Sequence, residues 1–175
     1  MPEKTLDITP SVTVHEMLET YPHLEDVLIG IAPPFKKLKN PLLRRSVARV
    51  ATIKHISAVG KVPLDELINK LRKAVGQSTS DQVYQEENYF GDKPDWFSED
   101  KIVVSVDEAK VEDRDKMTLV AVMNEAKKVE KGEIIELITT FLPAPGIDIL
   151  KSKGYLVWTV KGEGSQVRSY FLMDD

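Results

Sequence analysis

The fold of the second half of the chain is decided by Ile134–Val160, which reads IIELITTFLPAPGIDILKSKGYLVWTV. Its first five residues, four of them aliphatic, predict a strand that is covered on at least one face. Pro143 and Pro145 end that pattern, because proline has no N–H to give to a ladder, and Pro145 can instead open a helix. Gly154 ends the helix, and Tyr155–Val160 forms a second strand. So short a strand–helix–strand unit predicts parallel pairing through a right-handed crossover.

The segments around this stretch complete a small α+β domain. Ile102–Val106 predicts a first strand, and a helix that Asp115 can cap follows it. The glycines of Lys161–Ser165 indicate a hairpin loop before a last strand over Val167–Met173. The order β-α-β-α-β-β predicts a two-layer sandwich over residues 101–175, with two helices on a four-stranded mixed sheet. Both faces of the last strand carry apolar residues, so the face without helices is a candidate partner surface.

Residues 1–77 carry the start and stop signals of short helices. Thr13 and Glu16 form a capping box, in which each side chain satisfies the other residue's N–H. Asn40-Pro41 places an N-cap residue before a proline at the first helical position. Such signals predict a small all-α domain of about five short helices, preceded by a short strand at Leu6–Ile8. Helical spacing predicts buried side chains at Leu43, Val47 and Val50.

Residues 78–100 are polar and are predicted to be a linker between the two domains. Four aromatic residues nevertheless lie within nine positions, at Tyr89, Phe90, Trp96 and Phe97. The favoured interpretation is that they pack onto the second domain and fix its orientation. The alternative is an aromatic platform for a ligand or partner.

The composition excludes several classes of chemistry. The 175 residues include no cysteine, which excludes disulfides, thiolate nucleophiles, persulfides and Cys-ligated metal centres. No Ser-His-Asp order, phosphate loop or dinucleotide fingerprint occurs, and no cofactor is predicted. No apolar run approaches the ~20 residues of a membrane span, and the N-terminus lacks a signal-peptide pattern. We therefore expect a cytoplasmic protein with no membrane partner.

The C-terminal half resembles the TusA/SirA-like fold of the sulfurtransferases, and more closely a branch of it with no known function. The resemblance is carried by Val106-Asp107, by Phe141–Gly146 and by Lys153–Tyr155. Members of the sulfur relay have a Cys-Pro dipeptide after the first strand, which carries the persulfide. Here Val104–Ala109 occupies that region with neither residue, so the resemblance does not imply sulfur transfer.

The N-terminal half resembles a small helical domain of unknown function, associated by name with hybrid-cluster proteins and a redox disulfide. In members of the redox type, a Cys-x-x-Cys follows the glycine that matches Gly30, whereas this chain has Ala32–Phe35. The resemblance therefore implies binding or regulation rather than thiol chemistry. It is carried by Ile8–Pro10, Thr13-Val14, Tyr21-Pro22, Val27-Leu28 and Leu64–Leu67.

The preferred hypothesis is a non-catalytic binding, regulatory or adaptor module that acts through the C-terminal sheet and the 139–146 loop. A protein partner or a small ligand would bind there. The free N–H groups of Gly146–Asp148 could face an acidic ligand, although the prolines can equally be explained as a simple turn. The candidate ligand-binding residues are Thr139, Thr140, Phe141, Leu142, Gly146 and Ile147.

A basic segment over residues 36–54 supports an alternative hypothesis, an anion- or nucleic-acid-binding module. From Val27 to Leu64 there is no acidic residue, although the whole chain carries a net charge of −4. A solvated surface, or one that docks the acidic remainder of the chain, is the favoured explanation, and nucleic acid is the less favoured partner. The candidate anion-binding residues are Lys36, Lys37, Arg44, Arg45 and Arg49.

A third hypothesis, ranked last, is a metal-assisted accessory enzyme that uses acidic residues between the first strand and the next helix. Their spacing matches no calcium loop, and His15 with Glu19 supplies too few ligands for a site, so no metal site is predicted. The acidic residues are Asp107, Glu108, Glu112, Asp113 and Asp115.

Overall fold

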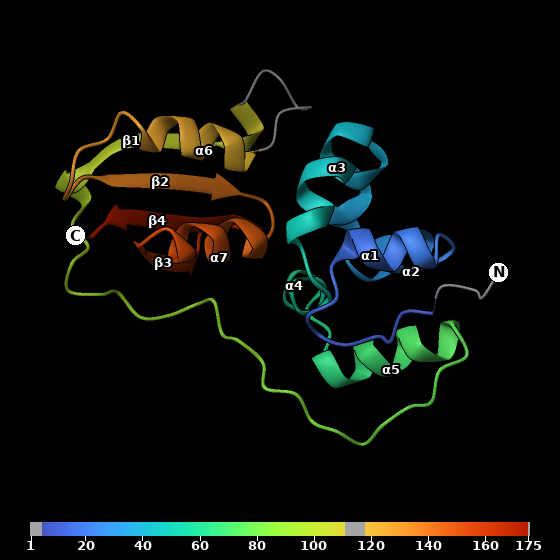
Figure 1. Ribbon diagram of the computed structural model, residues 1–175. Helices are drawn as coiled ribbons and strands as arrows, with labels where there is room; N and C mark the ends of the chain where they lie inside the picture. Colours follow the sequence, from blue (N-terminus) through green and yellow to red (C-terminus); the bar gives the residue numbers. More distant parts are fainter. Residues whose placement is uncertain (1–4, 111–117, 175) are drawn as a thin grey trace. The chain divides into compact units, whose positions relative to one another are not determined.

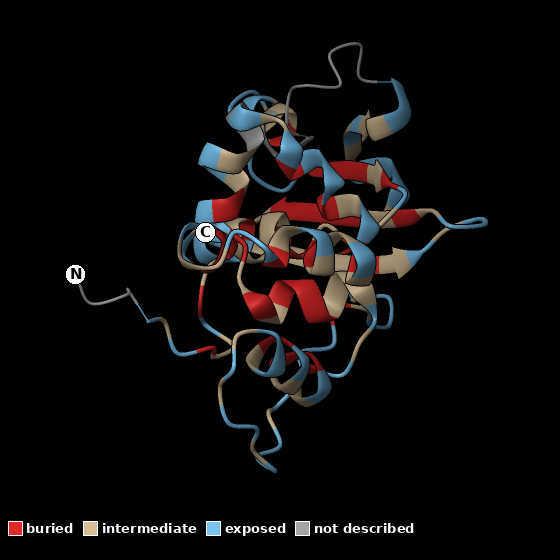
Figure 2. Cartoon of the chain, turned by 90° about the vertical axis from the view of Figure 1, so that its right-hand side faces the viewer, coloured by how far each residue is buried: buried red, intermediate tan, exposed pale blue. Residues whose placement is uncertain are grey.

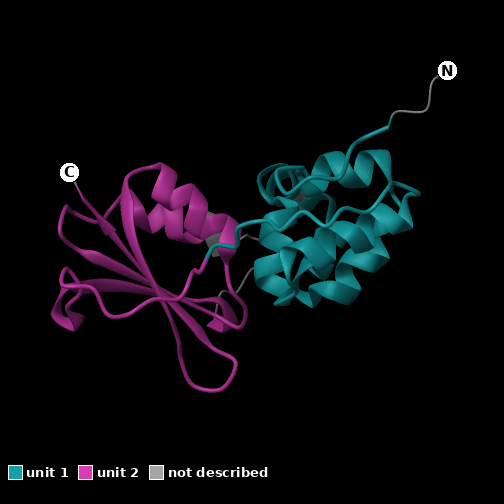
Figure 3. Ribbon diagram, turned by 90° about the horizontal axis from the view of Figure 1, so that it is seen from below, with its two compact units in different colours: residues 1–87 teal, residues 88–175 magenta. Residues whose placement is uncertain are grey.

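The computed structural model describes residues 5–110 and 118–174 (Figure 1). The chain divides into two compact units, Met1–Glu87 and Asn88–Asp175 (Figure 3). Unit 1 is built from helices, and the strands of the described sheet all lie in unit 2. The predicted α+β class is confirmed.

Unit 1 contains the short helices that the sequence predicts. The Thr13–Glu16 capping box is present: the Glu16 N–H donates to Thr13 Oγ1 at 3.1 Å, and the Thr13 N–H donates to Glu16 Oε2 at 2.9 Å. A 3₁₀ helix that was not predicted from the sequence begins at Pro33. The helices are α1 (Val14–Thr20), α2 (Leu24–Ile31), η1 (Pro33–Lys39), α3 (Pro41–Val50), α4 (Ile53–Gly60) and α5 (Leu64–Ala74).

A second capping box begins α4. The Thr52 N–H donates to Nδ1 of His55 at 3.0 Å. His55 therefore accepts the hydrogen bond from the N-cap residue that glutamate or glutamine usually accepts in a capping box. The same helix ends at Gly60, where a Cβ would lie 2.7 Å from the Ile31 carbonyl oxygen. Glycine is therefore what allows the end of α4 to approach the end of α2.

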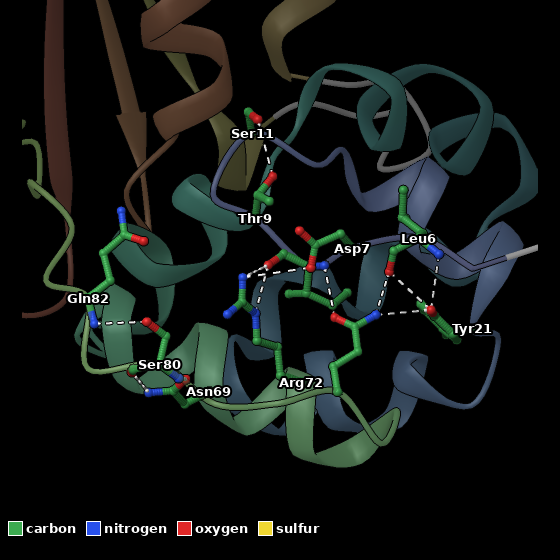
Figure 4. Close-up of polar contacts among 11 residues, drawn as sticks. Leu6, Asp7, Thr9, Ser11, Tyr21, Asn69, Arg72, Ser80 and Gln82 are labelled. Atoms are coloured by element: carbon green, nitrogen blue, oxygen red, sulfur yellow. Dashed lines mark hydrogen bonds and ion pairs between the residues drawn. The ribbon is translucent and has the colours of Figure 1, made fainter.

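Residues 6–8 are not a strand, contrary to the prediction. Their backbone groups are bound by side chains instead (Figure 4). Arg72 donates from Nε and Nη2 to the Ile8 carbonyl oxygen, at 3.1 and 2.9 Å. Gln77 Nε2 donates to the Leu6 carbonyl oxygen at 2.6 Å, and the Tyr21 hydroxyl donates to the same oxygen at 3.0 Å. We call these side chains and the residues 6–8 backbone the N-terminal network.

The core of unit 1 lies between the helices, and Figure 2 shows buried residues on their inner sides. One predicted core position is wrong: Val50 at the end of α3 is 41% exposed, whereas Ala48 is fully buried. Val47 is half-buried, and the Leu43 side chain lies outside the described part of the structure. The fully buried side chains include Met17, Leu24, Leu28, Ile53, Ile56, Leu64, Leu67, Ile68 and Leu71.

Unit 2 has the predicted four-stranded mixed sheet, and its strand order is β1-β2-β4-β3. Strands β1 and β2 are parallel, and β4 is antiparallel to both of its neighbours. Helix α6 packs on β1 and β2 and helix α7 on β3, on one side of the sheet (Figure 1). The elements are η2 (Glu99–Lys101), β1 (Ile102–Asp107), η3 (Glu108–Lys110), α6 (Thr118–Ala126), β2 (Ile134–Thr139), α7 (Ala144–Ser152), β3 (Tyr155–Lys161) and β4 (Val167–Met173).

The predicted pairing of β2 with β3 is wrong. Both strands are antiparallel to β4, so they run in the same direction, but β4 lies between them. The hairpin at residues 161–166 joins β3 to β4 and brings β4 alongside β3. Strand β4 thereby takes the place next to β2 that β3 would have in a simple crossover.

The predicted linker, residues 78–100, is divided between the two units. In unit 1, Ser80 and Glu86 bond back to the helices: the Ser80 N–H donates to Asn69 Oδ1 at 3.0 Å, and Glu86 Oε1 accepts from the Leu64 N–H at 2.7 Å. The second bond satisfies the start of α5, where Pro63 offers no side-chain cap.

Residues 88–97 follow the outer edge of β3. Tyr89 donates to Asp148 on α7 at 2.8 Å, and Phe90 forms a β-bridge with Thr159 on β3. Trp158 then donates from Nε1 to the Gly91 carbonyl oxygen at 2.9 Å, and Phe97 is buried against the sheet. The interpretation that these aromatic residues pack onto the second domain is therefore confirmed.

Candidate functional site

The side chains on the sheet face opposite α6 and α7, which we call the second face, form three rows that cross the strands. Cross-strand partners point to the same face, so the rows follow from the register. The inner row is apolar, the polar row contains charged and aromatic groups, and the outer row alternates charged and aliphatic side chains. The inner row is Ile102, Ile134, Leu172 and Leu156; the polar row is Ser105, Glu136, Tyr170 and Trp158; the outer row is Asp107, Ile138, Arg168 and Val160.

Phe97 covers the inner row and touches the aromatic end of the polar row. Its ring lies 4.7 Å from the Trp158 ring and 4.6 Å from the Tyr170 ring, in edge-to-face geometry. Trp158 and Tyr170 stack on each other at 5.2 Å. This aromatic cluster closes one half of the second face, and the outer row remains half-buried.

Glu136 is the centre of a side-chain network in the polar row. Its carboxylate accepts from Ser105 Oγ at 2.7 Å and from Arg168 Nη1 at 3.0 Å. The Glu136 side chain is 12% exposed and that of Arg168 is 35% exposed, so the carboxylate lies beneath the guanidinium. We call Ser105, Glu136, Arg168 and Tyr170 the Glu136 network. A buried carboxylate is tolerated here because its oxygens are hydrogen-bonded and its charge is paired.

The electrostatics of the Glu136 network favour a neutral Tyr170 and a charged Arg168. Burial raises the pKa of Tyr170 above its ordinary value of 10.0, and the hydrogen bond and negative charge of Glu136 raise it further. Burial acts to lower the pKa of Arg168, but the hydrogen bond and charge of Glu136 outweigh this effect, and the net shift is upward. Arg168 therefore keeps its positive charge at every physiological pH.

The hairpin loop helps to place the Arg168 side chain. A Cβ on Gly162 would lie 3.3 Å from Arg168 Nε and 3.1 Å from Gln166 Cβ, which is tighter than an ordinary van der Waals contact. Glycine therefore leaves room for the guanidinium between the loop and Glu136. The outer row thus presents a positioned cation between two aliphatic side chains, Ile138 and Val160.

The candidate residues of the 139–146 loop lie in different environments. Thr139, Leu142 and Ile147 are buried, so they support the fold. Thr139 Oγ1 donates to the Phe141 carbonyl oxygen at 2.6 Å, which closes the turn after β2. Thr140 is exposed, and Phe141 and Gly146 are half-buried.

The proposed acidic-ligand site at the start of α7 has few N–H groups to offer. The Ile147 N–H donates to the Pro143 carbonyl oxygen at 3.0 Å as the first bond of the helix. Asp148 accepts from the Tyr89 hydroxyl. The simple-turn explanation of the prolines fits these bonds better.

The acidic residues after β1 do not gather into a metal site within the described residues, where no group of three or more candidate ligands occurs. Asp107 Oδ1 accepts from the Ala109 N–H at 3.0 Å, and Asp107 Oδ2 lies 3.9 Å from the Lys110 ammonium group. Glu108 Oε2 lies 3.5 Å from the Thr140 N–H. The other predicted members, Glu112, Asp113 and Asp115, lie outside the described residues.

The basic candidates lie in unit 1. Lys36 and Lys37 on η1 and Arg45 and Arg49 on α3 are exposed. Arg44 is half-buried and pairs with Glu25 on α2 at 3.3 Å.

The Glu136 network was not predicted from the sequence, although one signal was present. Glu136 interrupts an otherwise aliphatic strand, and a charged residue in a central strand indicates a paired group. Its partner Arg168 is 32 residues away in the sequence. Only the strand order places the two side chains on adjacent strands, so the pair could not be assigned from the sequence.

One comparison with known proteins gives a match. A family model described as a domain of unknown function (DUF1858) matches residues 8–68, which span α1 to α4 and the first part of α5. This match supports an N-terminal domain of unknown function. No curated protein and no solved structure matches the chain. Within the part of the chain that the structure describes, every helix is too short or too polar to cross a bilayer.

Proposed function

We propose that the chain is a binding module of regulatory or adaptor type, which recognises its partner through the second face of the sheet and performs no chemistry itself. The observation that supports this most directly is the position of Arg168. It is a half-exposed cation held from below by a buried carboxylate and flanked by aliphatic side chains. Thr140, which directly follows β2, is exposed.

We further propose that unit 2 is a TusA/SirA-like domain without the Cys-Pro motif, and that unit 1 is a redox-disulfide-type domain without its cysteines. The element order β-α-β-α-β-β supports the first assignment, and the family match supports a domain of unknown function in unit 1. Because the chain has no cysteine, sulfur relay and thiol redox chemistry are not part of the proposal. The location that we propose is the cytoplasm.

The geometry suits a partner group that is acidic and flanked by apolar atoms. Arg168 would pair with the acidic group, while Ile138 and Val160 would contact the apolar part. The hydrogen bond to Glu136 already restricts the guanidinium, so little side-chain entropy is lost on binding. The buried carboxylate does not need to move, because its hydrogen bonds are complete before the partner arrives.

The test replaces Arg168 with glutamine in the full chain and compares the bound species with those of the wild type. Affinity capture with quantitative mass spectrometry detects protein partners, and native mass spectrometry detects retained small ligands. We expect a specific species to be lost with R168Q, and its direct affinity, measured by calorimetry, to fall by about tenfold or more, as for loss of a charged contact.

The matched control is Lys153→Gln, which removes an exposed charge at the end of α7. It should retain every species that R168Q loses. If both variants keep the wild-type set of bound species, the second face is not the recognition surface. Far-UV circular dichroism of R168Q checks that the loss is not caused by unfolding.

A further inference from the structure

Ser105 is the exposed member of the Glu136 network. It lies on β1, at one edge of the sheet, and its Oγ donates to Glu136 Oε1 at 2.7 Å. A hydroxyl group has a single proton, and in Ser105 that proton is directed to the carboxylate. The oxygen can therefore only accept a further hydrogen bond, so Ser105 offers a ligand an acceptor.

Arg168 offers the opposite, a positively charged set of donors. Its Nη1 donates to Glu136 Oε2 at 3.0 Å, and the guanidinium also interacts with the Tyr170 hydroxyl. Among the described residues it bonds to no other acceptor, and its side chain is 35% exposed. Most of its N–H groups are therefore available, in the forked geometry that fits both oxygens of a carboxylate.

The acceptor and the cation are held close together by one carboxylate. Ser105 bonds to one oxygen of Glu136 and Arg168 to the other. A ligand that bridges them carries an anionic acceptor and an N–H donor only a few atoms apart. Ile138, the cross-strand partner of Arg168, is half-buried and adds an aliphatic contact beside the cation.

These three contacts match one chemical group, the last residue of a polypeptide. In that residue the carboxylate, the N–H group and the side chain all leave the same α-carbon. An aspartate or glutamate within a peptide has its carboxylate at the end of the side chain, so it has no second side chain to place on Ile138. Carboxyl termini are also recurrent recognition elements in protein complexes.

Asp107 limits the negative charge that a ligand can carry. It lies in the outer row on the other side of Ile138 from Arg168, and its side chain is 22% exposed. The Ala109 N–H and the Lys110 ammonium group, 3.9 Å away, compensate its charge only in part. Asp107 therefore repels a second negative charge. A single carboxylate is favoured over a phosphate dianion, and an aliphatic last residue over an acidic one.

The openness of the second face favours a polypeptide over a free amino acid. Small ligands are usually bound in concave sites that cover most of their surface. Here the contacts lie on one face of a sheet, where Ser105 is exposed and Ile138 and Val160 are half-buried. A polypeptide can add contacts along this face that a free amino acid is too short to make.

We propose that Ser105 and Arg168 together bind the carboxyl terminus of a partner polypeptide that ends in an aliphatic residue. Arg168 pairs with the terminal carboxylate, and Ser105 Oγ accepts from the N–H of the last residue. The aliphatic side chain of that residue lies on Ile138. This inference rests on the proposed function, because it names the partner of the same face.

The experiment is fluorescence anisotropy of the full chain with a labelled glycine–serine peptide that ends in leucine. The peptide with a free carboxylate should bind, and the same peptide with a C-terminal amide should bind about tenfold or more weakly. R168Q should lose a similar factor for the free acid, and a peptide that ends in glutamate should bind less well because of Asp107. Equal binding of the amide and the free acid, or of the free acid to R168Q and wild type, would overturn the proposal.

A cycle that combines Ser105→Ala with an N-methylated last residue tests the second contact. Each change removes the same hydrogen bond, so each should weaken binding by about twofold to tenfold. The two changes together should weaken it no further than either one alone. Additive effects would show that Ser105 does not contact this N–H group. The matched control is Ser152→Ala, at an exposed serine on α7, which should bind as the wild type does.

Free leucine and N-acetyl-leucine, used as competitors, identify the source of the carboxylate. Both should displace the labelled peptide only weakly. Displacement as strong as that by the unlabelled peptide would assign the site to a small molecule and contradict a polypeptide partner.

This inference and the proposed function can fail separately. If R168Q loses a bound species in the capture experiment but no free-acid peptide binds the wild type, the inference alone is wrong. If R168Q loses no species and no peptide binds, both are wrong.

Discussion

The two units each contain a polar network. In unit 1 the side chains bond to backbone groups, whereas in unit 2 they bond to one another. In unit 1, Arg72, Gln77 and Tyr21 bond to the backbone of residues 6–8. In unit 2, the Glu136 network joins side chains to one another across three strands. A side chain that satisfies backbone groups fixes the path of the chain. A side chain that bonds to other side chains fixes only their orientation, which is what a recognition surface requires.

The difference teaches how to separate structural polar groups from functional ones. Arg72 and Arg168 are both charged and hydrogen-bonded, but the Arg72 side chain is 14% exposed whereas that of Arg168 is 35% exposed. Arg72 donates two hydrogen bonds, from Nε and Nη2, to the carbonyl oxygen of the buried residue Ile8. Arg168 donates from Nη1 to the Glu136 carboxylate, and part of its side chain remains accessible to solvent. We therefore expect substitutions of Arg72 to change stability and those of Arg168 to change binding.

The largest expected effect comes from removing Phe97, which covers the inner row and contacts Tyr170. Phe97→Ala should destabilise unit 2 by about 3 kcal/mol, because a buried aromatic side chain leaves a cavity against Trp158 and Tyr170. Both tryptophans lie in unit 2, so tryptophan fluorescence during urea unfolding reports on this unit. Phe97→Leu should recover more than half of the loss. A fluorescence midpoint that does not move would show that residues 88–97 are not part of the unit.

The next effect concerns the N-terminal network. Arg72→Met should cost about 2 kcal/mol, because the buried carbonyl of Ile8 loses two charge-assisted hydrogen bonds. Far-UV circular dichroism during urea unfolding measures it through the helices of unit 1. The neighbouring exposed Lys73→Met is the control and should stay within about 0.5 kcal/mol of the wild type. Equal effects of the two substitutions would contradict a structural role for the network.

A smaller effect is expected for the coupling between Glu136 and Arg168. A double-mutant cycle with E136Q and R168Q should give a coupling free energy of about 0.5–1 kcal/mol, since the guanidinium is partly exposed and screened by water. Urea unfolding followed by tryptophan fluorescence supplies the four values. Adding salt should reduce the coupling. A coupling above about 3 kcal/mol would place this pair among the buried structural ones and remove the contrast with Arg72.

The smallest effect is a change of stability at alkaline pH. The raised pKa of Tyr170 means that the folded state holds the phenol proton more tightly than the unfolded state, whose pKa is about 10. The resulting stabilisation is complete below about pH 10 and is lost as the pH rises through the folded-state pKa. Phenolate absorbance should show a late-ionising component, and Tyr170→Phe should reduce it. A late-ionising component of the same size in Y170F would contradict the raised pKa of Tyr170.

The helices were predictable because their signals are local. Thr13 with Glu16, and Asn40 with Pro41, lie at the starts of α1 and α3, as predicted. The position of β4 between β2 and β3 was not predictable, because it depends on pairing between segments that are distant in the sequence. The Glu136 network shares that cause, since its members lie on β1, β2 and β4. The packing of the aromatic residues of 88–97 on unit 2 was predicted from their clustering, but their partners on α7 and β3 were not, because those partners are distant in the sequence.

The two outermost strands of the sheet bear on how the protein behaves at high concentration. An unprotected outer strand is a template for intermolecular pairing and fibril growth. At the outer edge of β3, Phe90 forms a β-bridge with Thr159 and the Gly91 N–H donates to the Thr159 carbonyl oxygen. This part of the edge is therefore already paired by the same chain. At β1 an irregularity between Ile102 and Val104 interrupts the ladder and leaves Val103 half-exposed. Each outer strand thus has a feature that hinders regular growth of the sheet, and we expect the protein to resist this kind of aggregation.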